Sequence, residues 1–274
     1  MDPTELTQPP ELTITEALSP AALGRLLSVV ENGGAEAERV LGSLRDRVGQ
    51  AHRVGITGPP GAGKSTLAHA LVREWRSHGR TVAVVAVDPT SPVTGGALLG
   101  DRIRMEGVAL DEGVFIRSMA TRGALGGLAP ATRDVCDVLD GAGFDQVLVE
   151  TVGVGQTELD VVAATDTTVV VLVPESGDGI QTLKSGLMEI ADVFVVNKSD
   201  RPGADQLVKE IGAALELRTR ARDGWEPPVL RTIALSGEGV PALTEAIAGH
   251  RAWLDEAGRL AARRSRRAGP AERR

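Results

Sequence analysis

The chain of 274 residues has no tyrosine, only three phenylalanines and three tryptophans, and a single cysteine, Cys136. So few aromatic rings provide no evident platform on which nucleic-acid bases would stack. One cysteine excludes an internal disulfide, and the apolar stretch around Cys136 predicts a small buried residue of a helix. The histidines are scattered and offer no metal-transfer tract; they are His52, His69, His78 and His250.

Long hydrophobic runs and an overall basic charge are also missing. The longest apolar runs, such as Val169–Val173, have the length of strands, and the first residues show neither the basic nor the apolar part of a leader. The net charge is −7; residues 251–274 hold eight arginines against three acids, so the rest of the chain carries −12. We therefore expect a cytoplasmic protein that binds neither a membrane nor nucleic acid, with a solvated or frayed arginine-rich end at Arg263–Arg267.

A glycine-rich segment between a strand-like run and a helical run matches the phosphate-binding pattern G-x-x-x-x-G-K-[ST]. The glycines let successive backbone N–H groups face the phosphates, Lys64 is expected on the β- and γ-phosphate oxygens, and the Ser65 hydroxyl is expected on Mg²⁺. The pattern predicts that a nucleoside triphosphate is held by Gly58, Pro59, Pro60, Gly61, Ala62, Gly63, Lys64, Ser65 and Thr66.

An N-K-x-D sequence at the end of a later apolar strand predicts which base is bound. Asn197, Lys198 and Asp200 lie about 130 residues after the phosphate loop. The Asp200 carboxylate can accept hydrogen bonds from guanine N1–H and the 2-amino group, and adenine lacks both donors there, so ATP can be rejected by a factor on the order of 10⁴. A later turn could close over the base with backbone N–H groups, or be an ordinary turn, at Ser236, Gly237 and Glu238.

Two carboxylates come directly after, or at the end of, other expected strands. Asp88 opens a long loop of Gly, Pro and hydroxyl residues, and it is either a helix cap or a carboxylate near Mg²⁺ or the attacking water. Glu150 stands where a GTPase usually has D-x-x-G, so Lys64, Asp88 and Glu150 are the catalytic candidates. The Gly153 N–H can sense the γ-phosphate. Gln156 does not directly follow that glycine, so we expect slow intrinsic hydrolysis.

Strands that alternate with helices predict an α/β fold, a P-loop NTPase with a mainly parallel central sheet flanked by helices. We expect a disordered N-terminus at 1–14, a short N-terminal helical extension at 15–50, the P-loop GTPase domain at 51–250 and a basic C-terminal helix or tail at 251–274. The expected helices include 130–140 and 204–217. Strands are expected at 53–57, 81–87, 114–117, 146–150, 167–173, 193–197 and 229–235.

Four longer motifs add to these signatures: V-D-P-T-S-P at 87–92, G-G-A-L-L-G-D-R-I-R-M at 95–105, V-E-T-V-G-V-G-Q at 149–156 and G-D-G-I-Q-T-L-K-S-G-L-M-E-I-A-D at 177–192. From about Leu23 to about Arg267 the chain resembles the methylmalonyl-CoA mutase-associated GTPases. This MeaB-type family, also called LAO/AO transport ATPase-like, belongs to the signal-recognition-particle and nitrogenase-iron-protein branch of P-loop GTPases. The resemblance implies that Lys184 lies in an additional switch loop that communicates with the mutase. It also implies that Mg²⁺ is surrounded by Ser65, Asp88, Asp101 and Glu150.

The resemblance implies a GTP-hydrolysing chaperone that couples the GTP state to loading or protection of an adenosylcobalamin-dependent acyl-CoA mutase. GTP would be the substrate and Mg²⁺ the cofactor, with adenosylcobalamin entering only through the partner mutase. The alternatives are a metal-insertion GTPase of the nickel-chaperone type, a nucleotide-binding interaction module without turnover, and a transport-linked kinase. Family members carry a further C-terminal helical arm that builds a homodimer. Since this chain ends at Arg274, we expect a monomer or a weak, nucleotide-dependent dimer.

Overall fold

The computed structural model describes residues 19–88, 107–108, 110–120, 128–151, 163–174, 186–218 and 224–267. Its strands are β1 (His52–Thr57), β2 (Val82–Asp88), β3 (Val114–Ala120), β4 (Gln146–Thr151), β5 (Thr167–Leu172), β6 (Val193–Asn197) and β7 (Val229–Thr232). The helices are α1 (Pro20–Asn32), α2 (Ala35–Leu44), α3 (Lys64–Ser77), α5 (Leu128–Gly141), α8 (Met188–Ile190), α9 (Ala204–Arg218), α10 (Val240–Asp255) and α11 (Arg259–Arg267), with a 3₁₀ turn, η2 (Glu256–Gly258), before α11.

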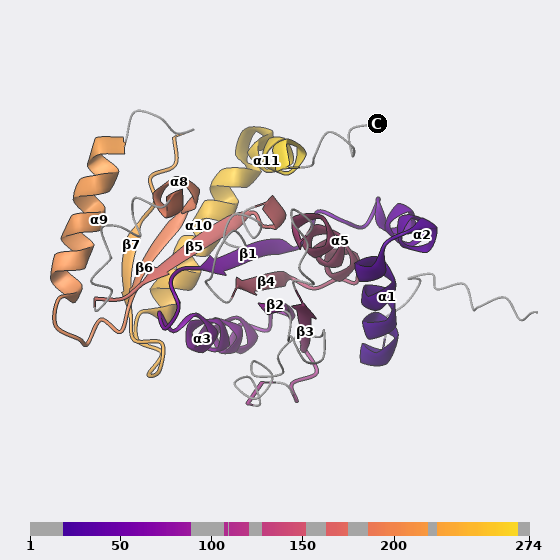
Figure 1. Ribbon diagram of the computed structural model, residues 1–274, viewed down its shortest axis with the longest axis horizontal. Helices are drawn as coiled ribbons and strands as arrows, with labels where there is room; N and C mark the ends of the chain where they lie inside the picture. Colours follow the sequence, from indigo (N-terminus) through magenta and orange to yellow (C-terminus); the bar gives the residue numbers. More distant parts are fainter. Residues whose placement is uncertain are drawn as a thin grey trace, which may run out of the picture.

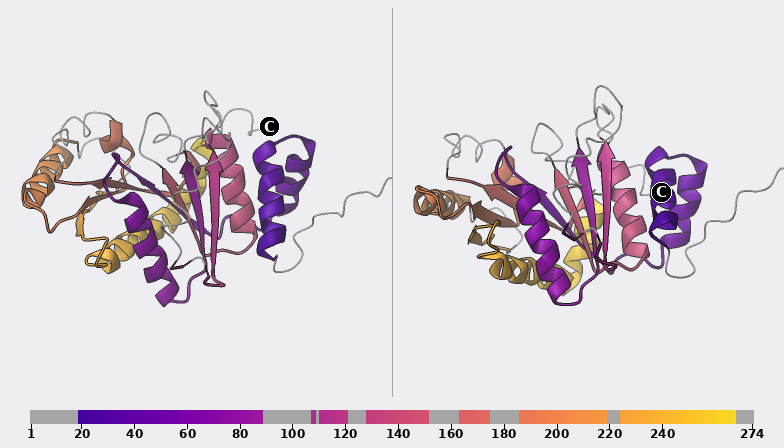
Figure 2. Two further views of the ribbon diagram at one scale, coloured as in Figure 1. Left: turned by 60° about the horizontal axis from the view of Figure 1, so that its bottom comes forward. Right: turned by 90° about the horizontal axis from the view of Figure 1, so that it is seen from below.

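The described strands form one parallel sheet in the order β3-β2-β4-β1-β5-β6-β7. Helices cover both faces of this sheet (Figures 1 and 2). The α/β fold with a central parallel sheet, expected from the alternation of strands and helices, is thereby confirmed. No helix among the described residues combines the length and the apolar character that crossing a membrane requires.

Alternate residues of the central strands pack into different cores. Val169 and Val171 of β5 join the core under α3 and α10, whereas Val170 and Leu172 join the core under α8 and α9. Successive side chains of a strand point to opposite faces, so a strand covered on both faces reads as a continuous apolar run. This explains why β5 is buried along its whole length.

The two N-terminal helices lie outside α5, on the side away from the sheet (Figures 1 and 2). The Ser19 hydroxyl accepts a hydrogen bond from the Ala22 N–H and begins α1, and Leu26 and Leu27 of this helix are fully buried. Arg117 of the edge strand β3 donates to Glu31 at 2.7 Å. The helical pair therefore shares a core with α5 and the sheet.

The last strand is shorter than the sequence predicts. We expected it to run to Leu235, but β7 ends at Thr232, and Ile233 pairs only with Glu238, in an isolated antiparallel bridge. Gly239 lies at a φ of 77°, and a Cβ there would approach the Arg231 carbonyl oxygen to 2.0 Å. The chain leaves the sheet at this point because a tight turn folds it back against β7 before α10 begins.

Buried ion pairs hold the amino-terminal edge of the sheet. Asp166 and Asp192 directly precede β5 and β6 and are 1% and 3% exposed. Both carboxylate oxygens of Asp166 accept hydrogen bonds from Arg264, and both of those of Asp192 accept from Arg263. The expectation of a solvated arginine-rich end is therefore wrong for these two arginines. Burial alone would raise the pKa of Asp166, but the hydrogen bonds and charge of Arg264 lower this pKa to about 2.

Two buried histidines share one hydroxyl group at the same edge. The Thr167 Oγ1 lies 2.6 Å from His52 Nε2 and 2.7 Å from His250 Nδ1. Because a hydroxyl carries one proton, it donates to one imidazole and accepts from the other. Burial lowers the pKa of His52 to about 3, so this ring is neutral in the folded protein at neutral pH.

We predict that acid destabilises the fold through His52. An unfolded histidine binds a proton near its ordinary pKa of 6.5, whereas the folded ring resists protonation until about pH 3, so stability present above pH 6.5 is lost as the pH falls. Between about pH 7.5 and 5.5, this one group should lower the free energy of unfolding by about 1.4 kcal/mol. Urea unfolding at both pH values measures the change.

The matched variants are His52→Gln and His78→Gln, because the His78 side chain is 68% exposed. His52→Gln should lose about 1.4 kcal/mol of the pH dependence of stability, and His78→Gln should keep the wild-type dependence. An unaltered pH dependence in His52→Gln would contradict the prediction.

Candidate functional site

The candidate site lies at the carboxyl ends of the central strands, the edge where open parallel sheets bind ligands. The phosphate loop joins β1 to α3 at this edge, and β4 and β6 end on either side of β1 and β5 in the sheet order. Glu150 comes from β4 and Asn197 from β6. Residues far apart in the sequence therefore meet around one loop.

Two glycines of the phosphate loop are required by both backbone conformation and space. Gly58 has a φ of 139°, and a Cβ there would lie 2.1 Å from the carbonyl oxygen of Val171 in β5. Gly63 has a φ of 87°, and its Cβ would lie 2.5 Å from the side-chain nitrogen of Asn197. These positive φ values favour glycine, and no side-chain atom fits in either gap. The loop is thus pressed against both β5 and the N-K-x-D segment.

Lys64 is the first residue of α3 and is only 6% exposed. Its ammonium group donates hydrogen bonds to the carbonyl oxygens of Gly58, at 2.9 Å, and Pro59, at 3.0 Å. These contacts hold the cation against the loop whose backbone is predicted to surround phosphates. The start of α3 adds the positive end of the helix dipole to the same place.

Ser65 and Glu150 meet beside Lys64. The Ser65 hydroxyl donates to Glu150 Oε1 at 2.5 Å, and the glutamate is 5% exposed. A hydroxyl and a carboxylate are oxygen ligands of the kind that Mg²⁺ prefers, so this pair fits the predicted metal. Of the other two predicted ligands, Asp88 ends β2 but its side chain lies outside the described residues, as does all of Asp101.

The side-chain amide of Asn197 connects three segments. Its nitrogen donates to the Ala62 carbonyl oxygen of the phosphate loop at 2.9 Å. Its oxygen accepts from the Thr232 hydroxyl at 3.0 Å and from the Ala234 N–H at 3.1 Å. The neighbouring Lys198 donates to the Gly61 carbonyl oxygen, also at 2.9 Å. The N-K-x-D segment is therefore bonded directly to the phosphate loop.

Asp200 lies in the turn after β6, exposed and without a side-chain hydrogen bond to any described residue. The later turn is arranged differently from what a base-binding loop would need. The N–H groups of Ser236 and Gly237 both donate to the Ile233 carbonyl oxygen at 3.0 Å, and the Glu238 N–H faces the Ser236 hydroxyl at 3.4 Å. These backbone donors are used within the turn, so their contact with a base stays a prediction.

Thr232 is a further residue of the candidate site, and no sequence motif marks it. The signal was a hydroxyl residue within the expected strand 229–235, but the pairing of Thr232 with Asn197 is visible only in the sheet. The switch candidates Gly153, Gln156 and Lys184 lie outside the described residues.

The sequence is similar to those of known proteins. A sequence model of the family described as "Methylmalonyl Co-A mutase-associated GTPase MeaB" matches residues 23–272. A protein of Pyrococcus horikoshii that carries a GTPase name is 53% identical over 248 residues, which cover 90% of this chain and 78% of that protein. The mitochondrial methylmalonic aciduria type A homolog of Mus musculus is 40% identical over 215 residues, which cover 77% of this chain and 52% of the mouse protein.

A solved structure has the same fold along most of the chain. The crystal structure of a LAO/AO transport system kinase superposes with a TM-score of 0.75 and is 30% identical. The match covers 91% of this chain and 76% of the kinase chain. The parallel sheet and the strand ends that carry the candidate site therefore belong to a fold shared with that protein.

We predict that Thr232 tunes nucleotide affinity through Asn197. Thr232→Val keeps the shape of the buried side chain but removes the hydroxyl donor, so Asn197 Oδ1 retains only the Ala234 N–H. Losing one buried hydrogen bond should weaken GDP binding roughly tenfold. Isothermal titration calorimetry measures the affinity, and urea unfolding verifies that the variant is folded. Thr232→Ser keeps the hydroxyl and should bind GDP with wild-type affinity. Wild-type affinity in Thr232→Val would show that the contact is dispensable.

Proposed function

The chain belongs to the methylmalonyl-CoA mutase-associated GTPases of the MeaB type, and we propose that it is the GTP-hydrolysing chaperone of an adenosylcobalamin-dependent acyl-CoA mutase. Membership confirms the resemblance drawn from the sequence motifs and makes the chain a P-loop GTPase. The finer role, coupling the GTP state to loading or protection of the mutase, is the proposal. The family description and the name of the mouse relative support it.

The observation that carries the proposal is the direct bonding of the N-K-x-D segment to the phosphate loop through Asn197 and Lys198. The loop proposed to hold the phosphates and the segment proposed to select the base are thereby bonded to each other, which supports a GTP-dependent switch. A ligand shifts a conformational equilibrium only by its differential affinity for the two states, so the switch must distinguish GTP from GDP through contacts to the γ-phosphate.

The chain's own residues divide the work on GTP. Lys64, held over the loop by two carbonyl groups, would move its hydrogen bonds to the β- and γ-phosphate oxygens. Ser65 and Glu150 would contribute to holding Mg²⁺, with Asp88 and Asp101 as the further candidate ligands. Bound Mg²⁺ supplies positive charge to the phosphate oxygens. Asp200 would accept from the donor edge of guanine.

Communication with the mutase is assigned to the segments after β2, β4 and β5 in the sequence. Gly153 would sense the γ-phosphate, and Lys184 would carry the state of the nucleotide to the partner. Linkage makes this coupling reciprocal: a mutase that binds the GTP form more tightly must raise the affinity for GTP by the same factor.

We predict a strong preference for guanine that depends on Asp200. Titration calorimetry with GDP and ADP should show GDP bound tighter by a factor on the order of 10⁴, since an adenine base leaves the carboxylate without its donors. Asp200→Ala should lose most of this preference. Asp205→Ala is the matched control, because Asp205 is an exposed acid of α9 paired with Arg231. Equal affinities of the wild type for the two nucleotides would refute guanine selection.

We also predict that nucleotide state sets the affinity for a mutase. With an adenosylcobalamin-dependent acyl-CoA mutase in solution, the complexes formed with GDP and with a non-hydrolysable GTP analogue should differ in affinity by about 5- to 150-fold. Surface plasmon resonance measures both affinities, and a phosphate-release assay measures turnover. Lys64→Ala should remove the difference because the triphosphate no longer binds productively.

Methylmalonyl-, isobutyryl- and ethylmalonyl-type mutases should be tested in parallel. If the wild type releases no phosphate with or without them, the chaperone has no GTP cycle and the proposal fails. If it hydrolyses GTP but its affinity for each mutase is independent of nucleotide, the GTPase stands and the coupling fails.

A further inference from the structure

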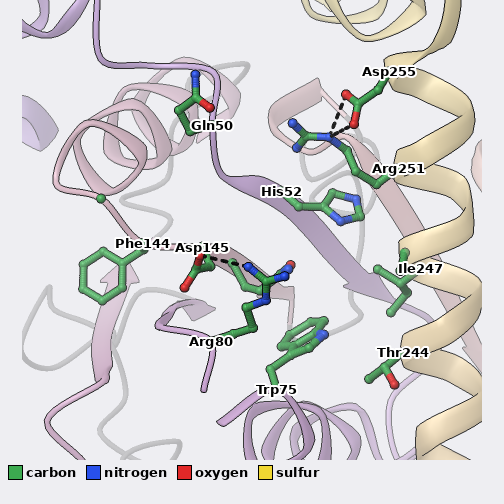
Figure 3. Close-up of a pocket in the computed structure, with 13 residues that line it drawn as sticks. Gln50, His52, Trp75, Arg80, Phe144, Asp145, Thr244, Ile247, Arg251 and Asp255 are labelled. Atoms are coloured by element: carbon green, nitrogen blue, oxygen red, sulfur yellow. Dashed lines mark hydrogen bonds and ion pairs between the residues drawn. The ribbon is translucent and has the colours of Figure 1, made fainter. Parts of the chain in front are cut away.

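A cavity of about 380 Å³ opens at the amino-terminal edge of the sheet, at the opposite ends of β1 and α3 from the phosphate loop. Figure 3 shows it between the start of β1, the end of α3 and one side of α10. Its volume lies in the range of about 300–1,000 Å³ that small-molecule sites occupy. No part of the proposed GTPase mechanism uses this cavity.

One part of the wall is apolar. Trp75 at the end of α3, Phe144 before β4 and Ile247 of α10 line it from three sides (Figure 3). Trp75 is 6% exposed, so its indole forms part of the core as well as of the cavity. A flat or branched apolar group placed here would leave water for a mostly preformed surface.

Arg80 provides a cation that its neighbours hold only loosely. Asp145 Oδ2 accepts from the Thr81 N–H at 2.7 Å and from the Thr81 hydroxyl at 2.9 Å, so this carboxylate is fixed without Arg80. The Arg80 guanidinium reaches Asp145 Oδ1 only at 3.4 Å, and its side chain is 61% exposed. Among the described residues, it has no other side-chain contact with an acceptor. Its planar fork is therefore available for a second carboxylate, which guanidinium groups bind in bidentate fashion.

The other charged groups of the lining are already engaged. Arg251 Nε donates to both oxygens of Asp255, at 2.9 and 3.0 Å (Figure 3). The Nη1 of Arg251 donates to the Ala51 carbonyl oxygen at 3.0 Å. His52 is neutral because burial lowers its pKa to about 3. The cavity therefore has one available positive group, Arg80, to pair with an anion.

Gln146 offers a hydrogen-bond acceptor to a ligand in the cavity. Its Oε1 is buried and accepts no hydrogen bond from any described residue. A buried acceptor without a donor costs free energy, and such a group calls for a specific partner. The last torsion of a glutamine side chain is broad, so the amide can turn toward the cavity that the residue lines. A ligand N–H would satisfy it.

We propose that this cavity binds a small organic carboxylate that also carries an N–H group and an apolar body, a ligand of the size and chemistry of an N-acylated amino acid. Its carboxylate pairs with Arg80, its N–H donates to Gln146, and its apolar group packs on Trp75. The site is separate from the nucleotide site and does not depend on a mutase.

The test titrates the whole chain with N-acetyl-L-phenylalanine and follows the Trp75 indole N–H by NMR, with Trp75→Phe assigning the signal. We expect saturation with a dissociation constant on the order of 1 mM, as befits a ligand of this size. Two probes each lack one group: N-acetyl-L-phenylalanine amide lacks the carboxylate, and 3-phenylpropionate lacks the N–H. Each should bind at least about tenfold more weakly.

Variants then assign each contact. Arg80→Gln should weaken the binding of N-acetyl-L-phenylalanine at least about tenfold. Arg73 is an exposed residue of α3 outside the cavity lining, so Arg73→Gln should bind this probe with wild-type affinity. Gln146→Met should bind N-acetyl-L-phenylalanine no more tightly than 3-phenylpropionate. It should still bind N-acetyl-L-phenylalanine more tightly than the amide, which lacks the carboxylate. Absence of saturation with all three probes overturns the proposal, as does wild-type affinity in a folded Arg80→Gln.

Discussion

The buried amide of Asn197 is the contact on which the geometry of the candidate nucleotide site depends. It bonds to the phosphate loop on one side and to the end of β7 and the following turn on the other. A buried amide that loses a partner is left with an unsatisfied group, so each of the three segments holds the other two in place. The close packing extends to Gly63, because the Asn197 nitrogen occupies the space that a Cβ would need. The segment proposed to recognise the base and the loop proposed to hold the phosphates are thus bonded to each other directly.

The opposite edge of the sheet is held by charges. Asp140 of α5 accepts from the N–H groups of Gly49, Gln50 and Ala51, and from the Arg53 side chain. The Ala51 carbonyl oxygen accepts from arginines of α10 and α11. The link between the N-terminal helices and β1 is therefore held by α5 and by the C-terminal helices. Removing one partner of such a buried pair leaves an unpaired charge, which costs far more than an exposed pair contributes.

The candidate nucleotide site and the cavity lie at opposite edges of the sheet. Parallel strands place all their carboxyl ends on one side, so the phosphate loop, Glu150 and Asn197 meet there although they are far apart in sequence. The amino ends meet on the other side, where the cavity is enclosed by strand starts, the end of α3 and the side of α10. β1 and α3 run between the two sides. The phosphate loop joins the end of β1 to the start of α3, whereas His52 lies at the start of β1 and Trp75 near the end of α3.

The sequence by itself determined the elements and the chemistry of the phosphate loop. Strands and helices follow from the spacing of apolar residues, which is local, and the G-x-x-x-x-G-K-S and N-K-x-D motifs are contiguous, so each can be recognised without knowing its neighbours. Tertiary structure alone decided that Thr232 bonds to Asn197, that Arg264 and Arg263 pair with the buried Asp166 and Asp192, and that Arg80 lines a cavity. The three pairs join residues that are 35, 98 and 71 positions apart, and these contacts depend on how the strands and helices are arranged in space. Strand order is fixed by the packing of both faces of the sheet as a whole, so no local pattern specifies it.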